Sequence, residues 1–310
     1  PLALRQPRPA PHQRPLALCA QGVPFRPRPA SVPGMRSPDP SPEEFFAAGG
    51  PLSRALPGYE PRPQQAEMAV RVAAALREGH ALLCEAPTGT GKTLAYLVPA
   101  VLSGLRVVIS TGTRHLQEQI LHKDLPLCEA ALGRPVSAAL LKGISNYLCL
   151  RRLSSQVDAQ ALLGPRGTLP LFPGEPIAPE AAGPLGRVLS WRRHTTTGDR
   201  AELVELGDDD PLWPLVSATS ETRLGSRCPF HDECFVTHAR RAAAEAQIVI
   251  VNHHLLCADL QVRGRFPEAR LLPAYDALIC DEAHGLEEVA TAYFGTSLGA
   301  ARLHALCRDL

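Results

Sequence analysis

The sequence has no apolar run that approaches the roughly 20 residues needed to cross a bilayer, so it predicts no membrane-spanning helix. It has almost no net charge, and the formal value of +1 argues neither for nor against a nucleic-acid partner. It also lacks an internal repeat and a signal peptide. We therefore expect its nine cysteines in a reducing, cytoplasmic compartment, where thiols stay free or bind metal.

Acidic residues are absent from Pro1–Gly34, which holds nine prolines and five arginines. Such a segment cannot bury enough apolar surface to order itself. Three interpretations remain open: a disordered basic tail, a transit peptide whose amphipathic helix the prolines would spoil, or a translated leader before a start at Met35. Residues 1–40 are accordingly expected to be a disordered or non-native leader.

The remaining chain, in a sequence that is 45% hydrophobic, alternates between strand and helix patterns. This alternation implies right-handed βαβ units and a parallel sheet, which is an α/β fold. The pattern breaks between residues 143 and 241, where prolines punctuate an expected loop at Gly164–Pro184. The expected strands are Ala81–Glu85, Arg106–Ser110, Gln247–Val251 and Ala277–Cys280, and the expected helices are Glu43–Ala47, Gln64–Arg77, Lys92–Leu102 and Arg114–Leu121.

A phosphate loop is predicted between the first strand and the third helix. Gly89 and Gly91 would let the backbone curl around phosphate oxygens, and the following helix would add its dipole. Lys92 would reach the β- and γ-phosphates of ATP, and Thr93 would offer a hydroxyl to Mg²⁺. A chance glycine-rich turn is the alternative, and the strand–loop–helix context argues against it. The nucleotide-binding residues are Ala86, in place of the usual glycine, Pro87, Thr88, Gly89, Thr90, Gly91, Lys92 and Thr93.

A second motif, the acidic Asp281-Glu282-Ala283-His284, follows the last expected strand. A carboxylate at the carboxyl end of a parallel strand is well placed for a nucleotide site. Asp281 would hold Mg²⁺, and Glu282 would orient and deprotonate the attacking water. The alternative is an ordinary acidic helix start.

With further motifs, the chain resembles the DinG/YoaA group of XPD-like iron–sulfur superfamily 2 DNA helicases from about Phe45 to Leu310. The resemblance implies a RecA-like motor domain in residues 41–142 and 242–285, a cluster insert in 143–241, and the start of a helical arch insert in 286–310. The C-terminal motor domain would be absent, which makes the chain an N-terminal fragment. The motifs are Arg62-Pro-Gln-Gln65-Ala-Glu-Met68, Ser110–Gln119, Lys142–Cys149 and Val251–Leu255.

Individual roles follow from the resemblance alone. Gln65 would bond the adenine edge, although it could be a solvated helix residue. Thr111 and Thr113 would touch the DNA backbone, although they could simply cap the next helix. His284 would couple the nucleotide state to the motor. A metal site at the His253–His254 pair is not expected, because the resemblance places both at a strand end inside the motor.

Four cysteines hold a [4Fe–4S] cluster in the resembled family, since soft thiolates suit iron. Cys149, Cys228 and Cys234 match three of these positions, whereas the fourth position is Arg223 here. Arginine keeps its proton and has no lone pair to offer. We therefore expect the cluster to be labile or absent. The alternative for the three cysteines is ordinary buried packing.

The resemblance implies ATP-dependent, 5′-to-3′ unwinding of single-stranded and forked DNA, in DNA repair. Two alternatives remain: a fragment that only binds nucleotide and single-stranded DNA, and a different P-loop NTPase. Arginines on the insert are either a solvated face or part of the DNA path, and Tyr147, Phe230 and Phe235 either stack on bases or pack. These arginines are Arg151, Arg152, Arg192, Arg193, Arg240 and Arg241.

Overall fold

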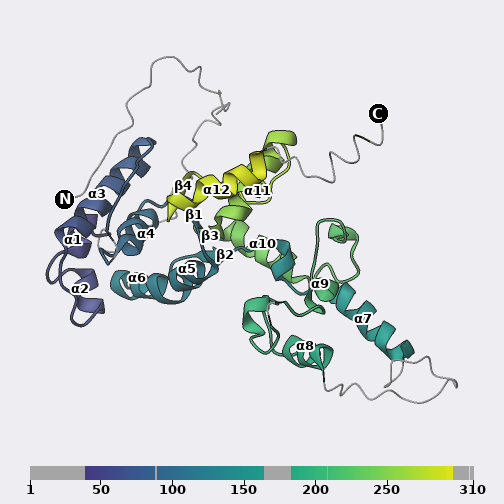
Figure 1. Cartoon of the computed structure of the whole chain (residues 1–310). Coiled ribbons are helices and arrows are strands. Elements are labelled where there is room, and N and C mark those ends of the chain that lie inside the picture. Colours follow the sequence, from purple (N-terminus) through teal and green to yellow (C-terminus); the bar gives the residue numbers. More distant parts are fainter. Residues whose placement is uncertain (1–38, 88, 164–182, 208, 296–306, 308–310) are drawn as a thin grey trace. The chain divides into compact units, whose positions relative to one another are not determined.

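The structure, a computed structural model, describes residues 39–87, 89–163, 183–207, 209–295 and 307 (Figure 1). The expected leader, most of the expected loop at Gly164–Pro184 and the end of the expected arch segment lie outside these residues. The chain divides into two compact units, Pro1–Gly104 with Asp124–Pro135 and Leu105–Lys123 with Val136–Leu310. Within the described part, no helix is both long and apolar enough to cross a membrane.

The first unit is helical where it is described. Its longest helix buries Met68, Ala69 and Val72 and ends at Gly79, whose φ of 69° is the left-handed helix cap that glycine favours. Phe45, Phe46 and Leu52 are completely or almost completely buried and complete the core. The helices predicted at 43–47, 64–77 and 92–102 are confirmed within one residue. The helices are α1 Pro42–Phe46, α2 Pro51–Ala55, α3 Pro63–Glu78, α4 Lys92–Leu102 and α6 Leu125–Leu132.

The strand predicted at Ala81–Glu85 is wrong, because this segment has only an isolated bridge residue at Cys84. A strand needs a neighbour to complete its backbone hydrogen bonds, and the described residues of the first unit contain no strand. The apolar side chains of Leu82 and Leu83 are exposed, by 36% and 64%. The apolar run therefore predicted burial that the segment does not have.

The second unit contains a four-stranded, fully parallel sheet in the order β2-β3-β1-β4. The three strands predicted at 106–110, 247–251 and 277–280 are confirmed within one residue, and so is the α/β class. The β2 strand was missed, because three residues are too short for a periodic signal. The strands are β1 Val107–Thr111, β2 Ala138–Leu140, β3 Ile248–Asn252 and β4 Ala277–Cys280.

Strand β1 lies between β3 and β4 and is buried along its whole length. Ser110 is in register with Val251 of β3 and Cys280 of β4, so the carboxyl ends of the three strands meet at one edge. Each end leads directly into a helical segment. These are α5 Arg114–Gln119, which continues as a π-helical turn at Ile120–Asp124, α11 His253–Arg265, and a 3₁₀ turn at Ala283–Gly285 followed by α12 Leu286–Phe294.

The segment between β2 and β3 has its own apolar core in the second unit. Trp213, Val188 and Val216 lie at its centre with Tyr147 and Phe235. The indole N–H of Trp213 donates to the Ser145 carbonyl at 2.9 Å, which satisfies its polar group. The helices are α7 Leu150–Leu163, α8 Pro184–Arg192, α9 Trp213–Val216 and α10 Phe235–Glu245, with 3₁₀ turns at Ile144–Asn146, Arg200–Glu202 and Gly225–Arg227.

Candidate functional site

The predicted phosphate loop has a backbone conformation that only glycine adopts readily. Gly89 and Gly91 have φ angles of 80° and 78°, and Gly91 is the N-cap of α4. Lys92 and Thr93 are therefore the first two residues of the helix, where backbone N–H groups and the helix dipole favour phosphate. The Thr90 hydroxyl donates to the Pro87 carbonyl at 2.9 Å and closes the turn. Thr88 lies outside the described residues.

Helix α3 and the residues just before it support this loop through hydrogen bonds that the sequence did not predict. The amide nitrogen of Gln65 donates to the Gly91 carbonyl at 3.0 Å, and the Tyr59 hydroxyl donates to the Gln65 side-chain oxygen at 3.2 Å. The Arg62 guanidinium donates to the Gly89 carbonyl. A Cβ on Gly91 would clash with the Gln65 amide. Gln65 is 4% exposed, so it is not a solvated helix residue, and its contact with adenine stays a prediction.

The acidic motif lies at the carboxyl end of β4 in the second unit. The Asp281 N–H donates to the Ser110 carbonyl at 2.8 Å, which ties the motif to the end of β1. The Glu282 N–H donates to the Asp281 carboxylate at 3.1 Å. Among the described residues Glu282 is the only non-glycine with positive φ, at 52°. Such strain is concentrated at functional sites. His284 is exposed, with its ring nitrogen 3.4 Å from the Glu282 carboxylate.

The segment after β1 is organised by threonines. The Thr113 hydroxyl accepts the Leu116 N–H at 3.3 Å and is the N-cap of α5, so the capping interpretation is confirmed for Thr113. Thr111 is completely buried, and its hydroxyl donates to the Thr113 carbonyl at 3.2 Å. Capping by Thr113 is compatible with a DNA phosphate contact at the same helix start, and that contact stays a prediction.

The two adjacent histidines differ in environment. His253 is 1% exposed, and its Nδ1 lies 2.7 Å from the Ser110 hydroxyl oxygen. Burial lowers the pKa of His253, although the nearby Asp281 carboxylate and the backbone of Asp281 and Glu282 act in the opposite direction. His254 is exposed, and its ring lies 6.1 Å from that of Tyr293.

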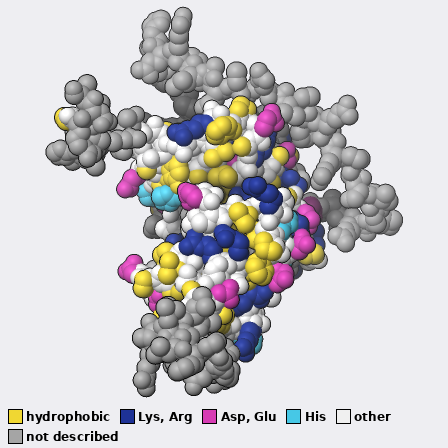
Figure 2. Space-filling model, turned by 90° about the vertical axis from the view of Figure 1, so that its right-hand side faces the viewer, with side chains coloured by type: hydrophobic (Ala, Val, Ile, Leu, Met, Phe, Trp, Pro, Cys, Tyr) yellow, Lys and Arg dark blue, Asp and Glu magenta, His cyan; other side chains and the backbone are white. Residues whose placement is uncertain are grey.

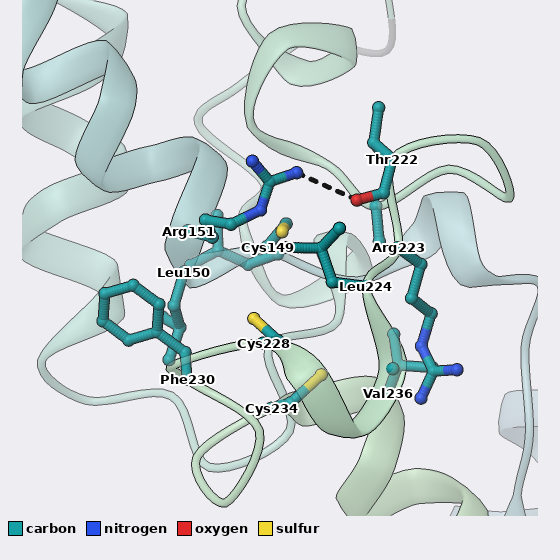
Figure 3. A pocket seen from close by; sticks show the side chains of 13 residues that line it. Cys149, Leu150, Arg151, Thr222, Arg223, Leu224, Cys228, Phe230, Cys234 and Val236 are labelled. Carbon is teal, nitrogen blue, oxygen red and sulfur yellow. Dashed lines mark hydrogen bonds between the residues drawn. The ribbon is translucent and has the colours of Figure 1, made fainter.

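The three predicted cluster cysteines line one small pocket, with a cavity volume of about 30 Å³. Cys149 precedes α7, whereas Cys228 and Cys234 flank the loop that leads into α10. Figure 3 shows the three sulfur atoms in the middle of the pocket, whereas the Arg223 side chain runs away from them past Val236. The guanidinium of Arg223 lies 3.4 Å from the Thr237 hydroxyl. The three thiols and Arg223 therefore line the same pocket, and the Arg223 guanidinium is directed toward Thr237.

The residues of this pocket do not fit a complete [4Fe–4S] ligand set. Such a cluster takes four thiolates in the resembled family, and only three thiols line the pocket. Across the described residues, no group of three or more His, Cys, Asp or Glu side chains is arranged to hold a metal ion. The pocket wall is instead largely apolar, with Leu148, Leu150 and Val236.

A second, more polar pocket lies between α5 and the 3₁₀ turn at Arg200–Glu202, with about 310 Å³ of internal space. Exposed Arg114 and half-buried Arg200 contribute positive charge to its wall. Lys142 also lines it, with its Nζ 2.6 Å from Glu118 and 2.5 Å from Asp199. Burial alone would lower the pKa of Lys142, but these two carboxylates raise it. Lys142 is therefore a structural cation, and the two arginines are the candidates for an anionic ligand.

The aromatic residues of the insert now divide into two groups. Tyr147 is 4% exposed, and its hydroxyl accepts the Lys142 N–H at 3.0 Å. Phe235 is 5% exposed, with the Arg192 guanidinium 5.3 Å from its ring centre. Both therefore pack in the core, whereas half-buried Phe230 lines the thiol pocket.

Several of the predicted basic residues have structural partners. The Arg151 guanidinium donates to the Thr222 carbonyl at 2.9 Å, and Arg152 donates to the carbonyls of Leu215 and Pro214. On the surface in Figure 2, basic and acidic side chains are interspersed with apolar ones. The arginines of the insert are thus a mixed set rather than a uniform cationic face.

Comparisons with known proteins agree with this geometry. The DEAD/DEAH box helicase family matches residues 63–170. The chain is 43% identical over 267 residues to the ATP-dependent DNA helicase YoaA of Haemophilus influenzae, which covers 86% of this chain and 39% of that protein. It is 44% identical over 266 residues to YoaA of Escherichia coli, with the same shares.

A third relative comes from a different bacterial lineage. The ATP-dependent helicase DinG of Mycobacterium tuberculosis H37Ra is 41% identical over 266 residues, which cover 83% of this chain and 39% of that protein. The chain therefore spans about two fifths of the length of these curated relatives. The phosphate loop at residues 86–93 lies in the region that the family matches. The chain thus matches the DEAD/DEAH box helicase family over residues 63–170, has an α/β fold consistent with a RecA-like domain, and is similar over most of its length to the YoaA and DinG ATP-dependent helicases.

Proposed function

We propose that this chain supplies the nucleotide-binding part of an ATP-dependent DNA helicase that moves 5′-to-3′ along single-stranded DNA and opens forked DNA during repair in the cytoplasm. One observation carries the proposal, namely that both nucleotide motifs occur at the expected structural positions. A phosphate loop with two glycines of positive φ leads into α4, and an Asp-Glu-Ala-His turn follows β4 of a parallel sheet. The names of the relatives support the activity and the DNA substrate. Polarity, repair and location rest on the family resemblance.

The residues have separate tasks in ATP hydrolysis. Lys92 neutralises charge on the β- and γ-phosphates, and Gln65 recognises the adenine. Thr93 and Asp281 are the residues whose hard oxygen atoms would hold Mg²⁺, and the bound ion would supply positive charge. Glu282 orients and deprotonates the attacking water, and His284 transmits the nucleotide state. These roles follow the family pattern, and the described loop and turn are compatible with them.

DNA contacts come from the edge of the sheet and the neighbouring polar pocket. Thr111 and Thr113 lie at the carboxyl end of β1, and Arg114 begins the next helix. Arg114 is exposed and lines the pocket with Arg200, whose guanidinium lies 5.3 Å from the Trp213 ring centre. Positive charge beside a hollow of this size, from exposed Arg114 above all, suits the phosphates of a single strand.

No step of this mechanism uses an iron–sulfur cluster. Three thiols remain where the family has four, and Arg223 offers no lone pair. The apolar core around Trp213 and Val188 supports the insert without metal. The insert thus keeps a place for DNA while its cluster is labile or absent.

The test measures ATP turnover by the full-length protein with and without a single-stranded oligonucleotide. We expect turnover to rise with the oligonucleotide and to be abolished in both Lys92→Ala and Glu282→Gln. Lys123→Ala, which changes an exposed lysine, is the matched control and should behave like the parent. Parental turnover in Lys92→Ala would refute the phosphate-loop assignment, and turnover that ignores DNA would favour a different P-loop NTPase.

A further inference from the structure

The buried histidine at the start of α11 has no role in the mechanism above. His253 is 1% exposed, and its Nδ1 lies 2.7 Å from the hydroxyl oxygen of Ser110, which is completely buried. The position is fixed by the N-cap, since the Asn252 side chain accepts the Leu255 N–H at 2.8 Å. A polar ring held this firmly inside a sheet edge requires a reason beyond packing.

The other ring nitrogen of His253 points toward the acidic motif. Nε2 is buried and has no hydrogen-bond partner among the described residues. A Cβ built on Gly112 would lie 4.0 Å from this nitrogen and 3.8 Å from the Cβ of Glu282. One small space is therefore bordered by the imidazole edge of His253, the Gly112 backbone and the Cβ of Glu282.

Ser110 joins this space to the acidic motif through the backbone. Its carbonyl accepts the Asp281 N–H at 2.8 Å, while its hydroxyl meets His253. Ser110 is thus bonded on two sides, by the residue before Glu282 and by the imidazole. A change in the segment after β1 would alter both contacts together.

Glu282 needs such support. Its φ of 52° and ψ of 45° place a non-glycine residue in the left-handed region. This conformation costs on the order of 1–3 kcal/mol and persists only where the surroundings determine it. The Glu282 Cβ and the His253 Nε2 both lie within 4.0 Å of the position that a Cβ on Gly112 would take, so the imidazole is close to this strained residue.

We propose that His253 is a positioning residue: it holds Glu282 in the conformation that activates water and links it, through Ser110, to the DNA-contacting segment after β1. This inference rests on the proposed function, because it gives Glu282 and Thr111–Thr113 the roles stated there. It adds a physical connection between the DNA-side segment and the hydrolytic carboxylate. Its two central residues, Ser110 and His253, are buried and belong to the second unit.

The experiment separates the two ring nitrogens in the full-length protein. His253→Asn places an amide near the Nδ1 position and keeps a partner for Ser110, but removes the Nε2 edge. His253→Gln places its amide near the Nε2 position instead. His254→Asn, on the same helical turn but exposed, is the matched control. ATP turnover, KM for ATP and the stimulation by single-stranded DNA are measured, with the thermal midpoint as a check on folding.

For His253→Asn we expect kcat to fall about tenfold, since the carboxylate is no longer oriented, while KM for ATP stays within about twofold. His253→Gln should retain more of the parental kcat than His253→Asn, and His254→Asn should match the parent. Parental kcat in His253→Asn would overturn the proposal. Equal loss in kcat and thermal midpoint for both His253 variants would also overturn it, because that pattern indicates packing alone.

Ser110→Ala tests the link without changing the ring. It removes one buried hydroxyl, and we expect stimulation by single-stranded DNA to fall about threefold or more. Unchanged stimulation would overturn the connection even if a His253 variant fails to fold. The parental protein separates the two claims: absence of stimulation there refutes the proposed function, whereas parental stimulation in Ser110→Ala refutes only this inference.

Discussion

Replacing Lys142 with methionine should destabilise the insert, because it leaves two carboxylates facing each other without their shared cation. The Lys142 side chain is 3% exposed, and its Nζ lies 2.6 Å from Glu118 and 2.5 Å from Asp199. Removing one partner of a buried ion pair costs about 3–5 kcal/mol. The two carboxylates left without Lys142 are partly stabilised by other neighbours. The Glu118 side chain is 35% exposed to solvent and lies 3.1 Å from His122. The Asp199 side chain is 13% exposed and accepts the Ala201 N–H. We therefore expect a loss near the lower end, about 3 kcal/mol.

With residues 1–310 the assay can isolate the insert, because both tryptophans of this sequence, Trp191 and Trp213, belong to it. Urea unfolding followed by tryptophan fluorescence should show a lower midpoint with an unchanged slope for Lys142→Met. The exposed Lys123→Met is the matched control, with an expected change within about 0.5 kcal/mol. Adding Asp199→Asn to Lys142→Met should recover about 1 kcal/mol, since one stranded charge is removed. Equal midpoints for Lys142→Met and Lys123→Met would refute the reasoning.

Three further predictions address the insert and the extent of the motor. Gly198→Ala should lower the free energy of unfolding by about 2 kcal/mol or more in the same assay, because φ is 64° and the new Cβ would clash with the Phe235 ring. The control Gly225→Ala, at φ 60° with nothing within 4 Å, should lower it by only about 1 kcal/mol. Equal losses for the two variants would contradict the clash. Anaerobically purified protein should hold a full complement of iron and sulfide only after Arg223→Cys, and four stable irons with Arg223 in place would show that the ligand set is misjudged. Residues 1–310 alone should not displace a DNA strand, because unwinding needs two motor domains that close over ATP, and robust displacement would contradict this.

The sequence predicted the buried strands and the long helices because their signals are local. The apolar runs at β1 and β3 pack on both sides in a parallel sheet, so continuous hydrophobicity and burial coincide there. Helix α4 begins at Lys92 as expected, because Gly91 before it adopts the left-handed conformation that glycine favours and a helix does not. The phosphate loop and the Asp-Glu-Ala-His turn were found for the same reason: their chemistry depends on residue types at fixed short spacings.

Contacts between distant segments left no such signal. The contact of Gln65 with adenine stays a prediction, but the hydrogen bond from its amide to the Gly91 carbonyl, 26 residues away, was not predicted. Lys142 was noted only as part of a motif, and its partners Glu118 and Asp199 come from segments on either side of it in sequence. A spacing rule cannot pair such residues, since tertiary packing decides the meeting. The strand predicted at Ala81–Glu85 failed in the same way, because an apolar run does not specify a partner strand.

Arg223 shows how a local substitution acquires a meaning that only its surroundings supply. From the sequence, an arginine at a ligand position removes one thiolate and adds a charge. In the structure this charge is unfavourably placed in two ways. The Nε of Arg223 is buried without a hydrogen-bond partner among the described residues. The pKa of the neighbouring Arg240 is lowered by burial and by the charge of Arg223. Two guanidinium groups beside the thiol pocket disfavour each other, whereas a cluster of iron and thiolates would carry negative charge. A bound cluster would therefore give these arginines an anionic partner, whereas the apolar core around Trp213 is formed by the segment's own side chains.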